Sequence, residues 1–259
     1  MIRVNVDMIS YIIILAIVTT ISSYILVTLI TDPINEAYAQ AVNASQIYNS
    51  KTLDVGNNAK NLIILIPNEG HESPKLPKEQ RLINQPYVPE NIVVSPGTNL
   101  RWFVGDVGHT RTISLVDSAS NNIFKSGDID FNQLSKPLLL NKSGTYKYFE
   151  RDVNQDDPSF VMEGTIKVQD NNSTSEPKSI TASAQPNFNT LTFLMVPSDS
   201  VEKQTKTLDN AGIKIVDKYS FKALDDGSNQ DILVLGTNEP SLDNVKKALT
   251  KITNSLPYG

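Results

Sequence analysis

Few side chains in this sequence suit covalent or metal chemistry. The 259 residues include no Cys and two His, His71 and His109. Without Cys, the chain has no disulfide, thiolate nucleophile, iron–sulfur cluster or Cys-ligated zinc. Two His exclude a His-rich metal centre and leave two candidate bases for a Ser–His–Asp triad. No nucleophile–base pair or pair of catalytic acids stands out, so we expect a protein that is not an enzyme.

The charge balance excludes one class of partner. The formal net charge is −5, from 23 Lys and Arg against 28 Asp and Glu. Proteins that bind nucleic acid normally present a basic face, and no cluster of basic residues supplies one here. We therefore expect no nucleic-acid partner. A chain of this length suits one or two ordinary domains.

The N-terminus is expected to enter a membrane. Met8–Ile30 is a run of 23 residues without a charge, and at ~1.5 Å per residue it is long enough to cross a ~30 Å hydrocarbon core. Arg3 precedes it, and the next Lys or Arg is Lys51. Residues 1–30 therefore predict a transmembrane anchor or uncleaved signal of a single-pass cell-membrane protein, with the bulk of the chain extracytoplasmic. Cleavage near Ala37–Ala39 is the alternative, and it leaves the same part outside.

Composition divides the remainder of the chain. Residues 31–59 are polar and lack a strong period, which indicates a stalk. Residues 170–188 are rich in Ser, Thr, Asn and Pro, a composition typical of a linker. Two candidate domains remain, at 60–169 and 189–259.

The first candidate domain has an all-β pattern. Short apolar or alternating runs recur between Gly, Asn, Asp and Pro residues. These runs are Leu62–Pro67, Ile92–Val94, Leu100–Val104, Thr112–Val116, Pro137–Leu140, Thr145–Phe149 and Thr165–Val168. Strands at this spacing predict a β-sandwich or barrel. Trp102 is expected to fill its core.

The second candidate domain alternates between strands and helices. Strands are predicted at 189–196, 213–223 and 232–236, with helices at 199–210 and 240–256. Gly212 follows the first helix at the position that favours glycine, and Asp226–Gly227 is a turn dipeptide. The βαββα order predicts a small open α+β sheet with both helices on one side.

Ordered motifs in the first domain point to a known fold. Tyr87–Val94 is followed by Gly97 and Trp102, and then by Asp106 and His109. The later motifs are Phe124–Gly127 (FKSG), Gly144–Tyr148 (GTYKY) and Met162–Val168 (MEGTIKV). Together they resemble the cupredoxins, the plastocyanin-like blue-copper family. The resemblance implies a Greek-key sandwich with its ligand loops at one end. It also implies that His109 and Met162 match two of the family's four copper ligands.

The other two ligands of the family are missing. Glu150 stands where the resemblance places the copper Cys, and the second His falls on Val153 or Asp157, depending on the end from which the loop is counted. Blue copper requires a soft thiolate, whereas a carboxylate is a hard ligand that favours Cu(II), Zn(II), Mn(II) or Ca(II). An electron-transfer cupredoxin is therefore the least expected of the functions considered.

Two interpretations of the altered site remain open. In the first, a divalent metal such as copper binds at a non-blue site made by His109, Glu150, one of three loop aspartates and Met162. The three aspartates are Asp152, Asp156 and Asp157, of which Asp157 is taken as the ligand. His71, in a polar loop, is expected to be solvated and to take no part.

In the second interpretation, metal binding is lost and the fold is kept as a contact module. His109 is then half-buried, and Glu150 pairs with Arg151, Arg111 or Arg101. We expect this interaction or accessory module, with no certain cofactor and a protein partner at the outer membrane face. A non-blue metal-binding protein is the alternative. The anchored, Cys-free chain with its Asn- and Ser-rich linker resembles the style of archaeal envelope proteins.

Overall fold

The computed structural model describes residues 52–55, 58–68, 86–151, 161–169, 188–223 and 227–256. The chain divides into compact units at residues 1–43 and 44–259, and every described residue lies in the second unit. The predicted membrane segment, His71, Asp157 and all but one residue of the predicted linker lie outside the described residues. Among the residues that are described, no helix is long and apolar enough to cross a membrane.

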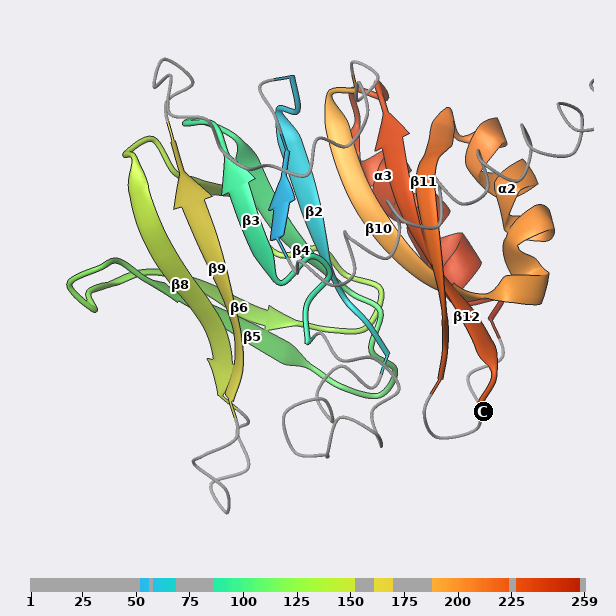
Figure 1. Cartoon of the computed structure of the whole chain (residues 1–259), viewed down its shortest axis with the longest axis horizontal. Coiled ribbons are helices and arrows are strands. Elements are labelled where there is room, and N and C mark those ends of the chain that lie inside the picture. Colours follow the sequence, from blue (N-terminus) through green and yellow to red (C-terminus); the bar gives the residue numbers. More distant parts are fainter. Residues whose placement is uncertain are drawn as a thin grey trace, which may run out of the picture. The chain divides into compact units, whose positions relative to one another are not determined.

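The described strands form two six-stranded sheets (Figure 1). The first sheet has the order β1 (Thr52–Asp54), β3 (Asn91–Val94), β9 (Val161–Val168), β8 (Gly144–Arg151), β5 (Arg111–Val116) and β6 (Asn122–Ile129). The second has the order β11 (Ile213–Lys222), β12 (Asn229–Thr237), β10 (Thr190–Pro197), β2 (Asn61–Ile66), β4 (Asn99–Val104) and β7 (Leu138–Leu139). The predicted β-sandwich is therefore present. Strand β1 comes from the end of the segment predicted as a stalk, and at three residues it is too short to give a sequence pattern.

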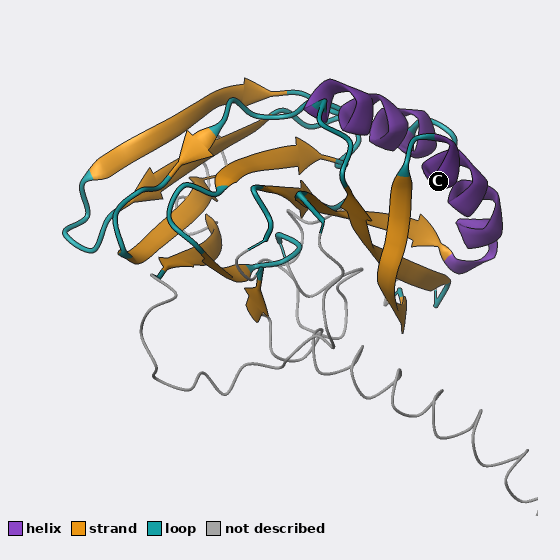
Figure 2. Cartoon of the chain, turned by 90° about the horizontal axis from the view of Figure 1, so that it is seen from above, coloured by secondary structure: helices purple, strands orange, loops and turns teal. Residues whose placement is uncertain are grey.

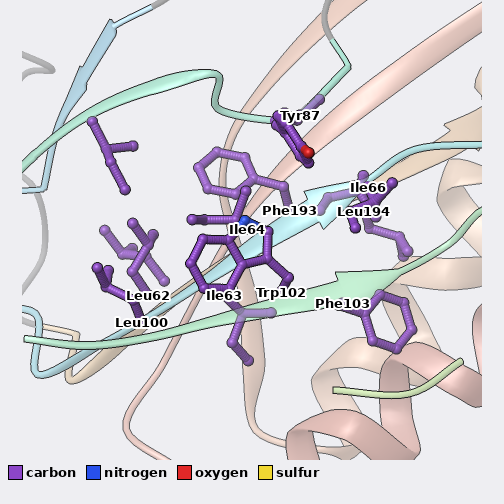
Figure 3. Close-up of a cluster of buried hydrophobic side chains, with 14 of the residues drawn as sticks. Leu62, Ile63, Ile64, Ile66, Tyr87, Leu100, Trp102, Phe103, Phe193 and Leu194 are labelled. Atoms are coloured by element: carbon purple, nitrogen blue, oxygen red, sulfur yellow. The ribbon is translucent and has the colours of Figure 1, made fainter. Parts of the chain in front are cut away.

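Aromatic side chains join the two sheets across the sandwich core. Trp102 on β4 lies 5.4 Å from Tyr148 on β8 and 6.0 Å from Phe124 on β6, measured between ring centroids. Trp102 is fully buried, as its expected core role requires. Figure 3 shows Trp102 in one buried cluster with aliphatic side chains of β2, Tyr87 and Phe193.

Strand β2 is buried on both of its faces. Its sequence NLIILI has no polar residue after the first position, which is typical of a strand covered on both sides. Ile64 is in register with Trp102 and so faces the first sheet. Leu65 is in register with Phe103, which points the opposite way. Figure 3 shows Phe103 beside the C-terminal helices, so these helices cover the outer face of the second sheet.

The C-terminal segment has the predicted βαββα order. Between β10 and β11 lie the short 3₁₀ helix η3 (Ser198–Ser200) and helix α2 (Val201–Asn210), and α3 (Leu242–Thr253) follows β12. Gly212 has φ of +70° just after α2, as predicted for that position. The Ser241 side chain accepts a hydrogen bond from the Asn244 N–H and caps α3. Figure 2 shows both helices on one side of the strands, and the predicted apolar face of α3 is buried.

One expectation for this segment was wrong. The sequence predicted a small open sheet of its own, but β10 pairs in parallel with β2 through Thr190↔Asn61 and Leu191↔Leu62. The backbone N–H groups of Lys60 and Asn61 also donate to the Asn189 carbonyl at 2.8 and 2.9 Å. Strands β10, β12 and β11 therefore continue the second sheet of the sandwich.

Candidate functional site

Three of the four residues that the sequence proposes as metal ligands, His109, Glu150 and Met162, lie in the described part of the chain. Glu150, near the end of β8, is the cross-strand partner of Met162, near the start of β9. Both share the inward face of their sheet with Tyr148, because side chains two residues apart point to the same side. Both side chains are buried. His109 lies in the connection between β4 and β5, which leaves the end of the second sheet.

A buried ion network occupies this end of the sandwich. The Arg111 guanidinium, at the start of β5, donates through Nη2 to Oδ2 of Asp106. Its Nη1 lies 3.7 Å from Oε2 of Glu150. The side chains of Asp106, Arg111 and Glu150 are 0%, 6% and 3% exposed. Buried charges require partners, and here one cation lies between two carboxylates.

Backbone geometry fixes Glu150 further. The backbone N–H of Thr112 donates to Oε1 of Glu150 at 3.1 Å. One carboxylate oxygen therefore accepts from β5, while the other faces Arg111 on the same strand. Of the partners considered for Glu150, Arg111 lies beside it. Arg101 instead donates to the Ser135 carbonyl, and the Arg151 side chain lies outside the described set.

His109 lies at the outer edge of the network. Its Nδ1 is 3.5 Å from Oδ1 of Asp106, and its side chain is 42% exposed. Asp106 therefore contacts His109 with one oxygen and Arg111 with the other. This agrees with the half-buried His109 expected for a contact module.

Two tyrosines lie beneath the network. The ring centroids of Tyr87 and Tyr148 are 4.8 Å apart, and the Tyr148 hydroxyl donates to the Glu90 carbonyl at 2.8 Å. Burial raises the pKa of Tyr87 well above its usual value, and the nearby negative charge of Glu150 raises it further. Burial likewise raises the pKa of Tyr148, with a smaller contribution from Glu90. The layer of side chains next to the ion network is therefore aromatic and uncharged at neutral pH.

Gly164 allows β9 to approach the Tyr148 ring closely. A Cβ at this position would lie 2.3 Å from the Glu90 carbonyl and 2.3 Å from the Tyr148 ring. Such contacts are far shorter than carbon atoms tolerate. The glycine of the MEGTIKV motif is therefore required by the packing of Tyr148.

The described residues do not fit a cupredoxin copper ion. The position matched to the copper Cys holds a carboxylate, which is a hard ligand, and a guanidinium already lies beside that carboxylate. No group of three or more His, Asp or Glu able to hold a metal occurs in the described parts of the chain. Asp152, Asp156 and Asp157 lie outside those parts. Glu150 is thus paired across the strands with Met162, His109 lies beside Asp106, and Arg111 lies between the carboxylates of Asp106 and Glu150.

The sequence analysis did not assign a role to Asp106 and left the role of Arg111 open. Asp106 was noted only as a marker ahead of His109, and Arg111 only as one of several possible partners for Glu150. The sequence offers two weak signals. One is an Arg at the start of the apolar strand Arg111–Val116, and the other is an Asp shortly after the preceding strand. Arg and Asp residues at such positions are commonly exposed and unpaired. The pairing of Arg111 with Asp106 is therefore seen only in the folded structure.

Comparison with solved structures finds cupredoxins that are similar to part of this chain. A purple cupredoxin from Nitrosopumilus maritimus is 22% identical, matches 42% of this chain and 99% of its own, and superposes with a TM-score of 0.31. Rusticyanin from Thiobacillus ferrooxidans is 11% identical over 46% of this chain and 82% of its own, with a TM-score of 0.32. A mutant fern plastocyanin is 13% identical over 41% of this chain and 99% of its own, with a TM-score of 0.29. No protein-family model matches the chain, and neither does any curated protein.

Proposed function

We propose that this protein is a cupredoxin-like interaction module whose copper site is degenerate. It acts as an accessory protein, by contact with a partner, and does not carry electrons on copper. The observation that carries the proposal is the buried Arg111 beside Glu150 at the position matched to the copper Cys. A cation placed there opposes a metal ion by charge repulsion. The chain also has no Cys that would supply the thiolate of blue copper.

A non-catalytic role is part of this proposal. His109 is the single described His, and its neighbour Asp106 also binds Arg111. Glu150, the other buried carboxylate at this end, is held by Arg111 and by the Thr112 N–H. The groups that would form an acid–base pair are thus tied to a guanidinium.

The proposed location is the outer face of the cell membrane. The uncharged run Met8–Ile30, with Arg3 before it and no Lys or Arg until Lys51, supports a single-pass anchor with the module outside. Such an anchor confines the module to the membrane surface. A membrane-bound protein complex is the partner that this geometry favours.

Calorimetric titration tests the loss of metal binding. The full chain, in a mild non-ionic detergent, is titrated with Cu(II) and with Zn(II), and visible and EPR spectra of the copper sample are recorded. We expect no saturable binding at micromolar concentrations and no intense band near 600 nm. Micromolar binding that His109→Ala or Glu150→Gln abolishes would replace this proposal with a non-blue metal-binding function. A blue copper spectrum would restore electron transfer.

Site-specific cross-linking tests the contact role. Val107 is 37% exposed and lies next to the ion network, after the end of β4. Leu139 is 57% exposed and is in register with Asn99 at the opposite end of β4. A photo-reactive residue at Val107 is expected to give a discrete cross-linked protein in native membranes, and the same residue at Leu139 is the matched control. Equal cross-linking from both positions would contradict a partner at this end of the sandwich.

A further inference from the structure

We infer that Asn141 is an acceptor for an N-linked glycan. The chain carries the Asn-x-Ser/Thr triplets that N-glycosylation requires, and they begin at Asn43, Asn141, Asn171 and Asn172. The triplet at Asn141 is the one that lies wholly within the described residues. The inference rests on the extracytoplasmic location in the proposed function, and it adds a covalent modification to it.

The acceptor triplet lies on the surface, in the connection between β7 and β8. Residues 141–145 are all exposed. The backbone around the acceptor is held in place, because the Leu140 carbonyl accepts from the Gly97 N–H at 3.0 Å and the Lys142 carbonyl accepts from the Tyr146 hydroxyl at 2.7 Å. The acceptor amide is therefore displayed on a fixed surface loop, where a bulky polar group disturbs no core packing.

The modification requires a donor of a definite chemical class. This donor is an oligosaccharide joined through its C1 carbon to a lipid phosphate or pyrophosphate. Nδ2 of Asn141 forms a bond to C1 while the bond from C1 to the phosphate oxygen breaks. The lipid phosphate leaves with the bonding electron pair, and the amide loses one proton to a base of the transferase, so no oxidant or reductant is needed. The proposed anchor Met8–Ile30 keeps the acceptor close to the membrane that holds such a donor.

Asn141 shares its side of the extended chain with Leu139. Burial alternates here, since Leu138 and Leu140 are buried whereas Leu139 and Asn141 are exposed. Leu139 is 57% exposed, the highest value for a large apolar side chain in the described part of the chain. Strand β7 is also the last strand of the described second sheet on this side. Sheet edges are sites of unwanted pairing between chains, and a glycan on Asn141 would cover this one.

The glycan would leave the proposed contact end of the sandwich free. Leu139 on β7 is in register with Asn99 at the start of β4, whereas Asp106 and the ion network follow the end of β4. Strand β4 has six residues, which corresponds to about 20 Å of extended chain. One end of the sandwich would therefore carry a polar glycan, and the other end would be open to a protein partner.

Mass spectrometry of the full chain purified from its native membranes tests the assignment. We expect the peptide that contains Asn141 to carry one or more hexose-type residues. Asn141→Gln and Ser143→Ala should each lose this glycan, whereas Ser143→Thr keeps the motif and should retain it. Asn210→Gln changes an exposed Asn outside any such motif and is the matched control. An unmodified Asn141 in the natural chain would overturn the inference.

Labelling of intact cells separates this failure from failure of the proposed location. A membrane-impermeant, amine-reactive ester should label exposed lysines such as Lys125 and Lys251 if the module lies outside the membrane. Labelled lysines together with an unmodified Asn141 would overturn the glycan and leave the proposed location intact. Unlabelled lysines together with an unmodified Asn141 would overturn both.

The covering role of the glycan has a separate test. In the same detergent, Asn141→Gln is expected to aggregate several-fold faster than the natural chain, as measured by light scattering. Addition of Leu139→Ser to this variant should remove most of the increase, because the exposed apolar side chain is then absent. Equal aggregation rates for Asn141→Gln and the natural chain would show that the glycan does not protect the edge at β7.

Discussion

The guanidinium of Arg111 lies between two buried carboxylates, in contact with Asp106, which follows β4 of the second sheet, and 3.7 Å from Glu150 on β8 of the first. Glu150 stands at the position that the sequence resemblance matched to the copper Cys. The stability of this end of the fold then depends on the ion network, and the predictions below follow from that dependence.

Loss of the buried cation should destabilise the fold strongly. Arg111→Met leaves the carboxylates of Asp106 and Glu150 buried without their cation, and should lower the free energy of unfolding by about 3–5 kcal/mol. Lys147→Met breaks an exposed pair with Glu163 and should cost ~0–1 kcal/mol. Urea unfolding at pH 7 measures both variants. Similar costs for the two would show that the buried network contributes little.

The glycine in β9 is expected to be intolerant of a side chain. Gly164→Ala places a methyl group against the Glu90 carbonyl and the Tyr148 ring. The resulting overpacking should cost about 1–3 kcal/mol. Glu163→Ala, at the adjacent exposed position, is the control and should cost less than about 1 kcal/mol. Thermal unfolding distinguishes the two, and an unchanged Gly164→Ala would disprove the close approach of β9 to Tyr148.

Alkaline pH should destabilise the protein through its buried tyrosines. The pKa values of Tyr87 and Tyr148 are raised in the folded state, first by burial. Their contribution is complete below the unfolded tyrosine pKa of about 10 and is lost as pH rises above it, because the unfolded chain then releases protons that the folded chain retains. Each tyrosine should contribute a slope of about 1.4 kcal/mol per pH unit in that range.

The double variant Tyr87→Phe and Tyr148→Phe isolates this effect. Urea unfolding of both proteins between pH 8 and pH 11 should show a shallower alkaline decline for the variant. At neutral pH the variant should be less stable, because Tyr148 no longer donates to the Glu90 carbonyl. Parallel alkaline declines would show that these hydroxyls ionise normally in the folded protein.

The C-terminal helices and the sandwich are expected to unfold together. Leu249 on α3 is fully buried, and Leu249→Ala should cost about 2–5 kcal/mol. Because β10 pairs with β2, hydrogen exchange should speed up at the amides of Ile63 and Leu65 as well as within α3. Protection unchanged at β2 would show that the C-terminal segment is an independent folding unit.

Local sequence patterns predicted most of the individual elements. The apolar face of 240–256 gave a helix, and Gly212 marked the end of the preceding helix. The apolar or alternating runs between Leu62 and Val168 gave most strands of the sandwich. Strand β6 (Asn122–Ile129) was not predicted, because most of its residues are polar or exposed. Strand β1 was also missed, because three residues carry no period.

Long-range pairing was not predictable from these patterns. The contact of β2 with β10 joins residues 61 and 190, and no local feature of either strand specifies the other as its neighbour. The ion network has the same origin, since Arg111 meets Asp106 and Glu150 only after β4, β5 and β8 are assembled. The motif resemblance singled out Glu150, but only the folded structure shows that Arg111 is the cation beside it.

Thermal unfolding with and without metal tests the central claim most directly. The full chain is heated in EDTA, and separately with Cu(II) or Zn(II) in excess. Because Arg111 already compensates the buried carboxylates, we predict the same Tm under all three conditions. A metal at a hundredfold excess over its Kd would add about 2.7 kcal/mol of stability. A rise in Tm of several degrees with either ion, absent in Glu150→Gln, would contradict the account.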